Sequence, residues 1–246
     1  DCFINAAITG VKGGMIVVAA DDPSMHSSQN EQDNRHYARA ARLPMVEPSD
    51  SQECLDYMKA AFDLSARWHI PVLYRVTTRV CHSKSLVEFS QRQEIPCQPF
   101  VRNIATRVST PANAYRNHAT VEKKMAELAE YGNTCPLNRV EMNGCKTGVV
   151  TAGIAYQYAK EAFPQDTSFL KLGLTNPLPM DLIRDFAAKV ETLYVIEELD
   201  PFMEEQIKAA GIPCVGKDLT GVLYELNPQL LAERIFGQTP QTKAVR

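Results

Sequence analysis

The chain has 246 residues, of which 45% are hydrophobic and 22% are charged. That composition is typical of a globular protein with a sizeable core, in one to two domains, and excludes an intrinsically disordered chain. The net charge of -3 provides no electrostatic basis for binding nucleic acid or an anionic membrane, and no apolar run approaches the ~18 residues that span a bilayer.

The chain opens on an apolar, helix-compatible segment, residues 2–9, followed by the glycine-rich residues 10–14. A start inside such a segment indicates an internal fragment of a longer protein. The alternative is a short, ordinary N-terminal helix. Because the apolar residues of 1–14 would need cover, self-association is expected.

Cysteine usage indicates a reducing compartment, so a cytoplasmic protein is expected. The number of cysteines is odd, and no Cys-x-x-Cys occurs, which argues against a disulfide framework, a zinc site and an iron–sulfur ligand run. The seven residues are Cys2, Cys54, Cys81, Cys97, Cys135, Cys145 and Cys214.

The first 90 residues alternate strand and helix signals. Continuous apolar or β-branched runs predict buried strands at 15–20, 44–48 and 72–78. Helices are predicted at 30–42 and at 49–69, with residues 49–53 as the start of the second. The second has capping-box spacing at either Asp50 and Glu53 or Ser49 and Gln52. This order predicts parallel pairing with right-handed crossovers.

Residues 91–147 are predicted to be a linker that contains one helix, 113–131. A second α/β unit then follows over residues 148–236. Its strands are predicted at 148–153, 169–174, 193–196 and 212–215, and its helices at 154–163, 176–190 and 202–210. Residues 237–246 are a polar tail. The predicted fold class is therefore α/β, with two three-layer units and mostly parallel sheets.

The densest polar cluster follows the first predicted strand and leads into a helix. His26, Ser27, Ser28, Gln29 and Asn30 would surround the helix N-terminus, where free N–H groups and the dipole favour an anion such as a carboxylate. Ligands of open α/β sheets bind outside the carboxyl ends of the strands, where this loop lies. Alternatively, Ser28 or Asn30 caps the helix and the other side chains are solvated.

Two more clusters follow predicted strands. Arg79 and His82 come after the third strand and would open on the same side as the first loop, where an arginine suits a carboxylate. The alternative is a surface arginine at a strand end. Glu197, Glu198 and Asp200 offer acid/base groups or metal ligands. We favour the alternative that they are helix N-terminal acids before Pro201.

Several segments closely resemble the α subunit of indolepyruvate:ferredoxin oxidoreductase, a thiamine-diphosphate-dependent 2-oxoacid:ferredoxin oxidoreductase. They are residues 9–14, 17–35, 46–50, 75–80 and 197–202, of which the long segment to Arg35 is the most specific. The resemblance implies that residues 1–90 form the later part of a pyrimidine-binding domain. It further implies that residues 148–236 form a transketolase C-terminal-like domain.

The resemblance also implies an activity. Members of this family use thiamine diphosphate and Mg²⁺ to decarboxylate aryl pyruvates such as indolepyruvate oxidatively. They transfer the acyl group to coenzyme A and pass electrons through iron–sulfur clusters to ferredoxin, with the help of a second (β) subunit. His26 to Asn30, Arg79 and His82 are then candidates to face substrate or cofactor.

The chain departs from the family pattern in what it lacks. The glutamate that activates the cofactor lies upstream of residue 1 in the family, and the Gly-Asp-Gly motif and the cysteine runs are absent. The chain alone is therefore expected to hold no complete catalytic site and no metal site, and to be inactive. The alternatives are the same machinery for pyruvate or a branched-chain 2-oxo acid, or a non-catalytic transketolase-like assembly module.

Overall fold

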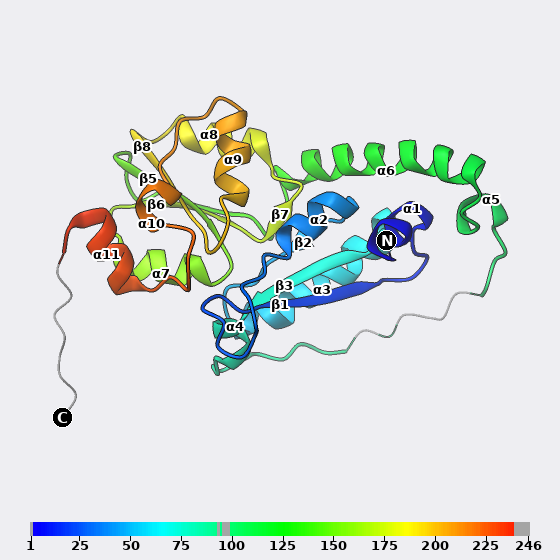
Figure 1. Ribbon diagram of the computed structural model, residues 1–246, viewed down its shortest axis with the longest axis horizontal. Coiled ribbons are helices and arrows are strands. Elements are labelled where there is room, and N and C mark those ends of the chain that lie inside the picture. Colours follow the sequence, from blue (N-terminus) through cyan, green and yellow to red (C-terminus); the bar gives the residue numbers. More distant parts are fainter. Residues whose placement is uncertain (1, 93, 95–98, 239–246) are drawn as a thin grey trace.

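Two four-stranded sheets lie side by side in the chain (Figure 1). The structure is a computed structural model that describes residues 2–92, 94 and 99–238. In the first sheet, β1 (Ile16–Asp21), β3 (Val72–Thr77) and β2 (Met45–Val46) run parallel, in the order β1-β3-β2. The predicted parallel pairing of the first three strands is therefore confirmed.

Four helices belong to the first sheet's half of the chain. They are α1 (Cys2–Thr9), α2 (Arg35–Ala41), α3 (Ser51–Trp68) and the short α4 (Thr78–His82). Asp50 caps α3 by accepting a hydrogen bond from the Glu53 N–H, which decides between the two capping registers. Helix α3 ends at His69 in a left-handed conformation, just before Pro71.

The second sheet has the order β4-β6-β5-β8, with β4 (Arg139–Glu141) antiparallel to β6 (Ser168–Leu172). The other strands, β5 (Thr147–Ala152) and β8 (Thr192–Ile196), are parallel. Its helices are α7 (Ile154–Ala162), α8 (Met180–Ala187), α9 (Phe202–Ala209), α10 (Lys217–Thr220) and α11 (Pro228–Phe236).

The two sheets share structure. Strand β7 (Leu174–Asn176) follows β6 after Gly173, yet pairs antiparallel with β2 of the first sheet. The predicted single strand 169–174 is thus two strands in two sheets. One hydrophobic cluster likewise contains Ala38, Met45 and Leu73 from the first half and Leu170 and Phe202 from the second. The halves are therefore packed on a common core.

Two further predictions differ from the structure. Helix α2 begins at Arg35 instead of Asn30, because the residues before it form a loop tied to Asp21 and Asp22. The predicted strand 212–215 makes only one bridge, Tyr194 to Val215.

The predicted linker 91–147 holds α5 (Ile104–Arg107), the long α6 (Pro111–Gly132) and β4. Among the described residues, no helix is long and apolar enough to cross a membrane. Residues 239–246 of the predicted tail, and Cys97, lie outside the described residues.

Candidate functional site

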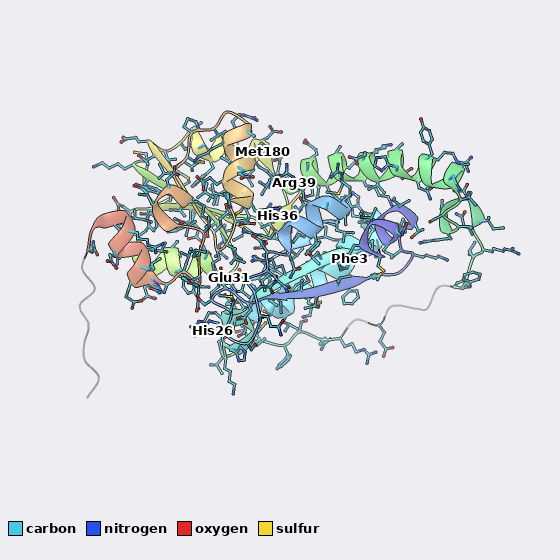
Figure 2. The ribbon with its side chains drawn as sticks, viewed as in Figure 1. Phe3, His26, Glu31, His36, Arg39 and Met180 are labelled. Atoms are coloured by element: carbon cyan, nitrogen blue, oxygen red, sulfur yellow. The ribbon has the colours of Figure 1, made fainter. Side chains whose placement is uncertain are left out.

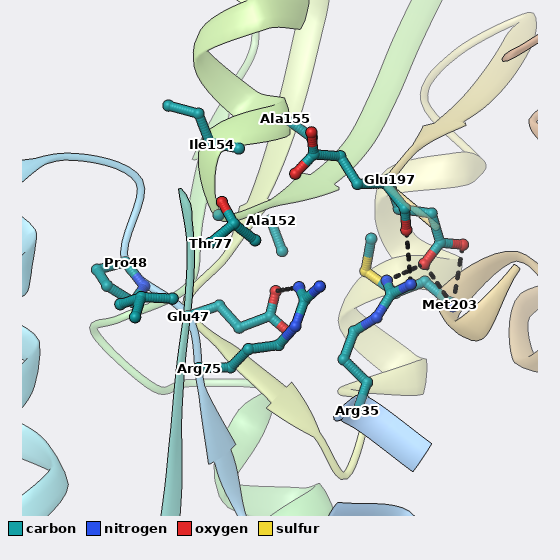
Figure 3. A pocket seen from close by; sticks show the side chains of 13 residues that line it. Arg35, Glu47, Pro48, Arg75, Thr77, Ala152, Ile154, Ala155, Glu197 and Met203 are labelled. Carbon is teal, nitrogen blue, oxygen red and sulfur yellow. Dashed lines mark hydrogen bonds and ion pairs between the residues drawn. The ribbon is translucent and has the colours of Figure 1, made fainter. Parts of the chain in front are cut away.

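A network of buried charges lies where the two sheets meet (Figure 3). Arg35, the first residue of α2, is 2% exposed and forms ion pairs with Asp33 and Glu197. Its guanidinium also donates to the main-chain carbonyls of Glu198 and Asp200, at 2.7 and 2.9 Å. A buried charge requires such full pairing, because its desolvation is otherwise uncompensated.

A second buried arginine comes from the centre of the first sheet. Arg75, on β3, pairs with Asp21 at the end of β1 and with Glu47 just after β2, the latter at 3.2 Å. Its second terminal nitrogen, Nη2, is buried without a hydrogen-bond partner among the described residues. The parallel order of β1, β3 and β2 explains this meeting, because it places the carboxyl ends of the three strands at one edge.

Between the two arginines lies a narrow pocket, also lined by Thr77, Gly153 and Glu198. The hydroxyl of Thr77, like Arg75 Nη2, is buried without a partner in the described part of the chain. The volume open to the centre of a water molecule is only ≈ 10 Å³, so the pocket has room for about one water. The pocket as it stands suits a bound water that satisfies these groups.

Burial perturbs the titration of groups around this pocket. It raises the pKa of Glu198 to about 7, against an opposing effect of Arg75. Burial also raises the pKa of Glu197, although Arg35 favours its charged form, and lowers the pKa of Lys217 to about 8. Glu198 is thus a carboxyl group that exchanges a proton near neutral pH, as general acids and bases do.

The loop after β1, which carries His26 (Figure 2), and helix α4 meet at a further carboxylate, Glu225. His26 Nε2 lies 3.0 Å from a Glu225 carboxylate oxygen, and Arg79 donates to both oxygens of the same group, with Nη2 at 2.9 Å. Burial acts to raise the pKa of Glu225, but the hydrogen bonds from Arg79 and His26 outweigh it and lower the pKa. The structure therefore brings two of the sequence-predicted residues onto one carboxylate.

The other predicted residues are placed differently. The N–H groups of Ser27 and Ser28 donate to the Asp22 carboxylate, at 2.9 and 3.1 Å, so the anion they hold is part of the chain. Gln29 is exposed, and the Asn30 side chain accepts from Gln32. All four precede the start of α2, so the helix N-terminus predicted for them lies elsewhere.

His82 ends α4 and is exposed. Sequence reasoning missed Arg35, Asp21, Glu47 and Glu225 as parts of a site. The sequence did contain a signal for Arg35, because it is the last residue of the polar segment that follows β1. The signal for Glu225 was absent, because it is a lone acid in a mostly apolar segment, residues 221–227, far along the chain.

Among the described residues, one group of side chains has the composition of a possible metal site. Three potential metal ligands converge within 4.8 Å of one another, Asp33, His36 and Asp200. Asp33 is already committed to Arg35, and His36 pairs with Asp200 at 2.9 Å. No group of three cysteines appears among the described residues. The charges at the meeting of the sheets serve mainly to join them.

The chain is 44% identical over 253 residues to the indolepyruvate oxidoreductase subunit IorA of Methanothermobacter thermautotrophicus, and 38% identical over 235 residues to that of Archaeoglobus fulgidus. These alignments cover 97% and 92% of the chain. The chain is therefore similar to IorA subunits over nearly its whole length. No protein-family model matches it.

The chain spans about two fifths of the length of these relatives, 41% and 38%. Among solved structures, it resembles a 2-oxoglutarate:ferredoxin oxidoreductase from Magnetococcus marinus, with a TM-score of 0.71 at 14% identity. That match covers 96% of the chain and 50% of the solved one. The predicted α/β class with two mostly parallel sheets is confirmed.

Proposed function

We propose that the chain forms part of the α subunit of an indolepyruvate oxidoreductase that uses ferredoxin as electron acceptor. The observation that carries the proposal is 35–44% identity to six IorA subunits over 92–97% of the chain. The solved relative, a ferredoxin-dependent enzyme for another 2-oxo acid that was determined with coenzyme A bound, supports the reaction class. The reaction would be oxidative decarboxylation of an aryl pyruvate to an acyl-CoA.

The two halves would have separate roles in the complete subunit. We propose that residues 1–90 belong to a pyrimidine-binding domain and residues 148–236 to a transketolase C-terminal-like domain. Because the chain spans only about two fifths of its relatives' length, other parts of the enzyme, including a β subunit, would contribute to the thiamine diphosphate, Mg²⁺ and iron–sulfur sites. The described residues would contribute a rigid scaffold and loops that face the substrate or cofactor.

His26 and Arg79 are the side chains best placed to meet a substrate carboxylate. Both are partly exposed, at 40% and 57%, and both already contact the Glu225 carboxylate. A 2-oxo acid presents the same group, and an arginine with two donors binds it in a fixed orientation. Glu225 would then hold His26 and Arg79 in place until a substrate carboxylate replaces it.

Steady-state kinetics of the complete enzyme test this proposal. Ferredoxin reduction is followed anaerobically with coenzyme A and a panel of indolepyruvate, pyruvate, a branched-chain 2-oxo acid and 2-oxoglutarate. Preference for indolepyruvate supports the proposal, and preference for another acid reassigns the substrate. Absence of turnover with all four, in an enzyme with its cofactors bound, would favour a non-catalytic assembly module.

Single variants then test the loops. Arg79→Ala and His26→Ala should each lower kcat/KM for the preferred acid by about tenfold, because a charge-assisted hydrogen bond to the substrate is lost. Glu225→Gln should lower KM, because it removes the competing charge. His118→Ala, an exposed histidine on α6 that is far from this cluster in the sequence, is the matched control. Wild-type kinetics in both loop variants would remove these loops from the active site.

A further inference from the structure

A large cavity lies among α1, α5 and α6. These elements are at the end of the molecule away from the second sheet (Figure 1). The volume of the cavity is ≈ 1230 Å³, above the range of about 300–1,000 Å³ typical of small-molecule sites. Its walls are the end of α1 and the turn after it, His69, one face of α6, and the segment 100–108 that contains α5. We call this segment the strap.

The strap is fixed to its surroundings by specific hydrogen bonds. From α6, Asn117 donates to the Thr106 carbonyl at 3.1 Å, and Asn113 donates to the Val108 carbonyl at 2.9 Å. From the turn after α1, Lys12 reaches the Pro99 carbonyl at 2.9 Å, and Arg107 on the strap donates to the Gly10 carbonyl. Contacts at both ends hold the outer wall in place, so the cavity is a defined part of the fold.

The cavity is lined by cations without matching acids. Lys12, Arg102, Arg107 and Lys124 line it, and no aspartate or glutamate does. Among the described residues, none of the four forms an ion pair. Lys12, Arg107 and Lys124 donate only to main-chain carbonyls, the last to His69 at 3.1 Å. Burial and the nearby charge of Arg107 lower the pKa of Lys124, although the charge of Glu127 acts in the opposite direction.

The remaining lining is largely apolar and incompletely covered. Phe100, Val101 and Ile104 of the strap are 92%, 61% and 51% exposed. Exposed apolar side chains beside unpaired cations indicate a ligand with both characters. Inorganic phosphate would satisfy only the cations, and a neutral hydrocarbon would leave them unpaired.

We propose that this cavity binds an amphipathic anion, in which an apolar aryl or acyl body carries a carboxylate or phosphate group. The apolar body would lie against Ile104 and Val121, and the anionic group would reach Lys124 and Arg102. The cavity is separate from the His26 and Arg79 cluster in its lining residues. The proposal therefore does not depend on the proposed function.

Equilibrium dialysis with the purified holoenzyme measures this binding directly. The probes are 1-naphthyl phosphate and 1-naphthaleneacetate, with 1-naphthalenemethanol as the neutral body and inorganic phosphate as the bare anion. Both naphthyl anions should bind at least about tenfold more tightly than either control. The tighter of the two identifies the head group. Equal affinity of the neutral alcohol, or no binding of either naphthyl anion, would overturn the proposal.

Variants locate the binding. Lys124→Gln and Arg102→Gln should each weaken it about tenfold, since each removes one charged donor. Lys123→Gln removes the same charge from the neighbouring position of α6, which is exposed and does not line the cavity, and should leave affinity unchanged.

Because an aryl carboxylate could also enter a substrate site, Arg79→Ala is included and should leave probe affinity unchanged. Loss of probe affinity in Arg79→Ala but not in Lys124→Gln, or equal loss in Lys123→Gln and Lys124→Gln, would refute the assignment. Circular dichroism of Lys124→Gln checks its folding, and Arg102→Gln, whose exposed side chain makes no described hydrogen bond, provides an independent variant.

Discussion

Replacing Arg35 with methionine should strongly destabilise the fold, because the substitution leaves buried carboxylates without their counter-ion. Arg35 and Glu197 are each 2% exposed, and Asp33 is 6% exposed. Removing one member of a buried ion pair costs about 3–5 kcal/mol in the free energy of unfolding. For a chain of this size, that corresponds to a Tm lowered by about 6–20 °C.

The double variant Arg35→Met/Glu197→Gln separates the ion pair from the packing of the arginine. Once Glu197 is neutral, the loss of Arg35 should cost less, so the double variant should be more stable than the sum of the single effects by about 1 kcal/mol or more. Urea and thermal unfolding provide both values. Arg184→Met is the matched control, since its pair with Asp181 is exposed at 54% and 67%. It should change stability by only about 0–1 kcal/mol.

The outcome that would refute this reasoning is specific. If Arg35→Met changed stability no more than Arg184→Met, the buried network would not join the two sheets energetically. Strict additivity in the double variant would show that Arg35 acts through packing or through Asp33 rather than through Glu197.

Two further predictions concern residues near these contacts. The pKa of Glu198 is about 7 in the folded chain, against an ordinary value of 4.5. Between pH 4.5 and 7 the folded state therefore binds a proton that the unfolded state has lost, and the free energy of unfolding falls as pH rises through this range. Glu198→Gln should remove this dependence and, above pH 7, stabilise the chain by about 3 kcal/mol at most; an unchanged pH profile of Tm would contradict the assignment. Gly173→Ala should destabilise by about 1–3 kcal/mol, because its Cβ would meet the Leu137 carbonyl at 2.5 Å, whereas Gly13→Ala meets nothing within 4 Å. Equal unfolding midpoints for the two alanine variants would argue against the close approach at Gly173.

The first sheet could be predicted because its signals are local. Buried parallel strands show as continuous apolar runs, and the start of α3 shows as an acidic capping pair, Asp50 and Glu53. Strand β7 could not be predicted in the same way. Its residues continue the apolar run of β6. The chain passes to the other sheet at Gly173, which packs tightly against Leu137 and Tyr57. Such long-range contacts leave no periodicity in the sequence.

The start of α2 was misplaced for a related reason. Ser28 and Asn30 are good N-cap residues, but the carboxylates of Asp21 and Asp22 bind the loop instead, and Asn34 precedes the helix. Local capping preference, worth about 1 kcal/mol, is smaller than the requirement to pair the buried carboxylate of Asp21. Its partners, Asn34 and Arg75, lie 13 and 54 positions away. Helix-capping propensities consider only neighbouring residues, so they do not include the need to pair a buried carboxylate with distant partners.

In the candidate site, too, the contacts that follow from local sequence signals could be predicted, and those between distant residues could not. The carboxyl-edge rule correctly placed Arg79 near the loop of His26, because β1 and β3 are parallel neighbours. Nothing local marked Glu225, which contacts His26 and Arg79 from 199 and 146 positions away. Arg35 joins the halves in the same manner, across 162 positions to Glu197. In both cases an arginine from the first half of the chain is neutralised by a glutamate from the second. The geometry of the loops therefore depends on the packing of both halves, and a change at their junction should alter the loops even where it leaves His26 and Arg79 untouched.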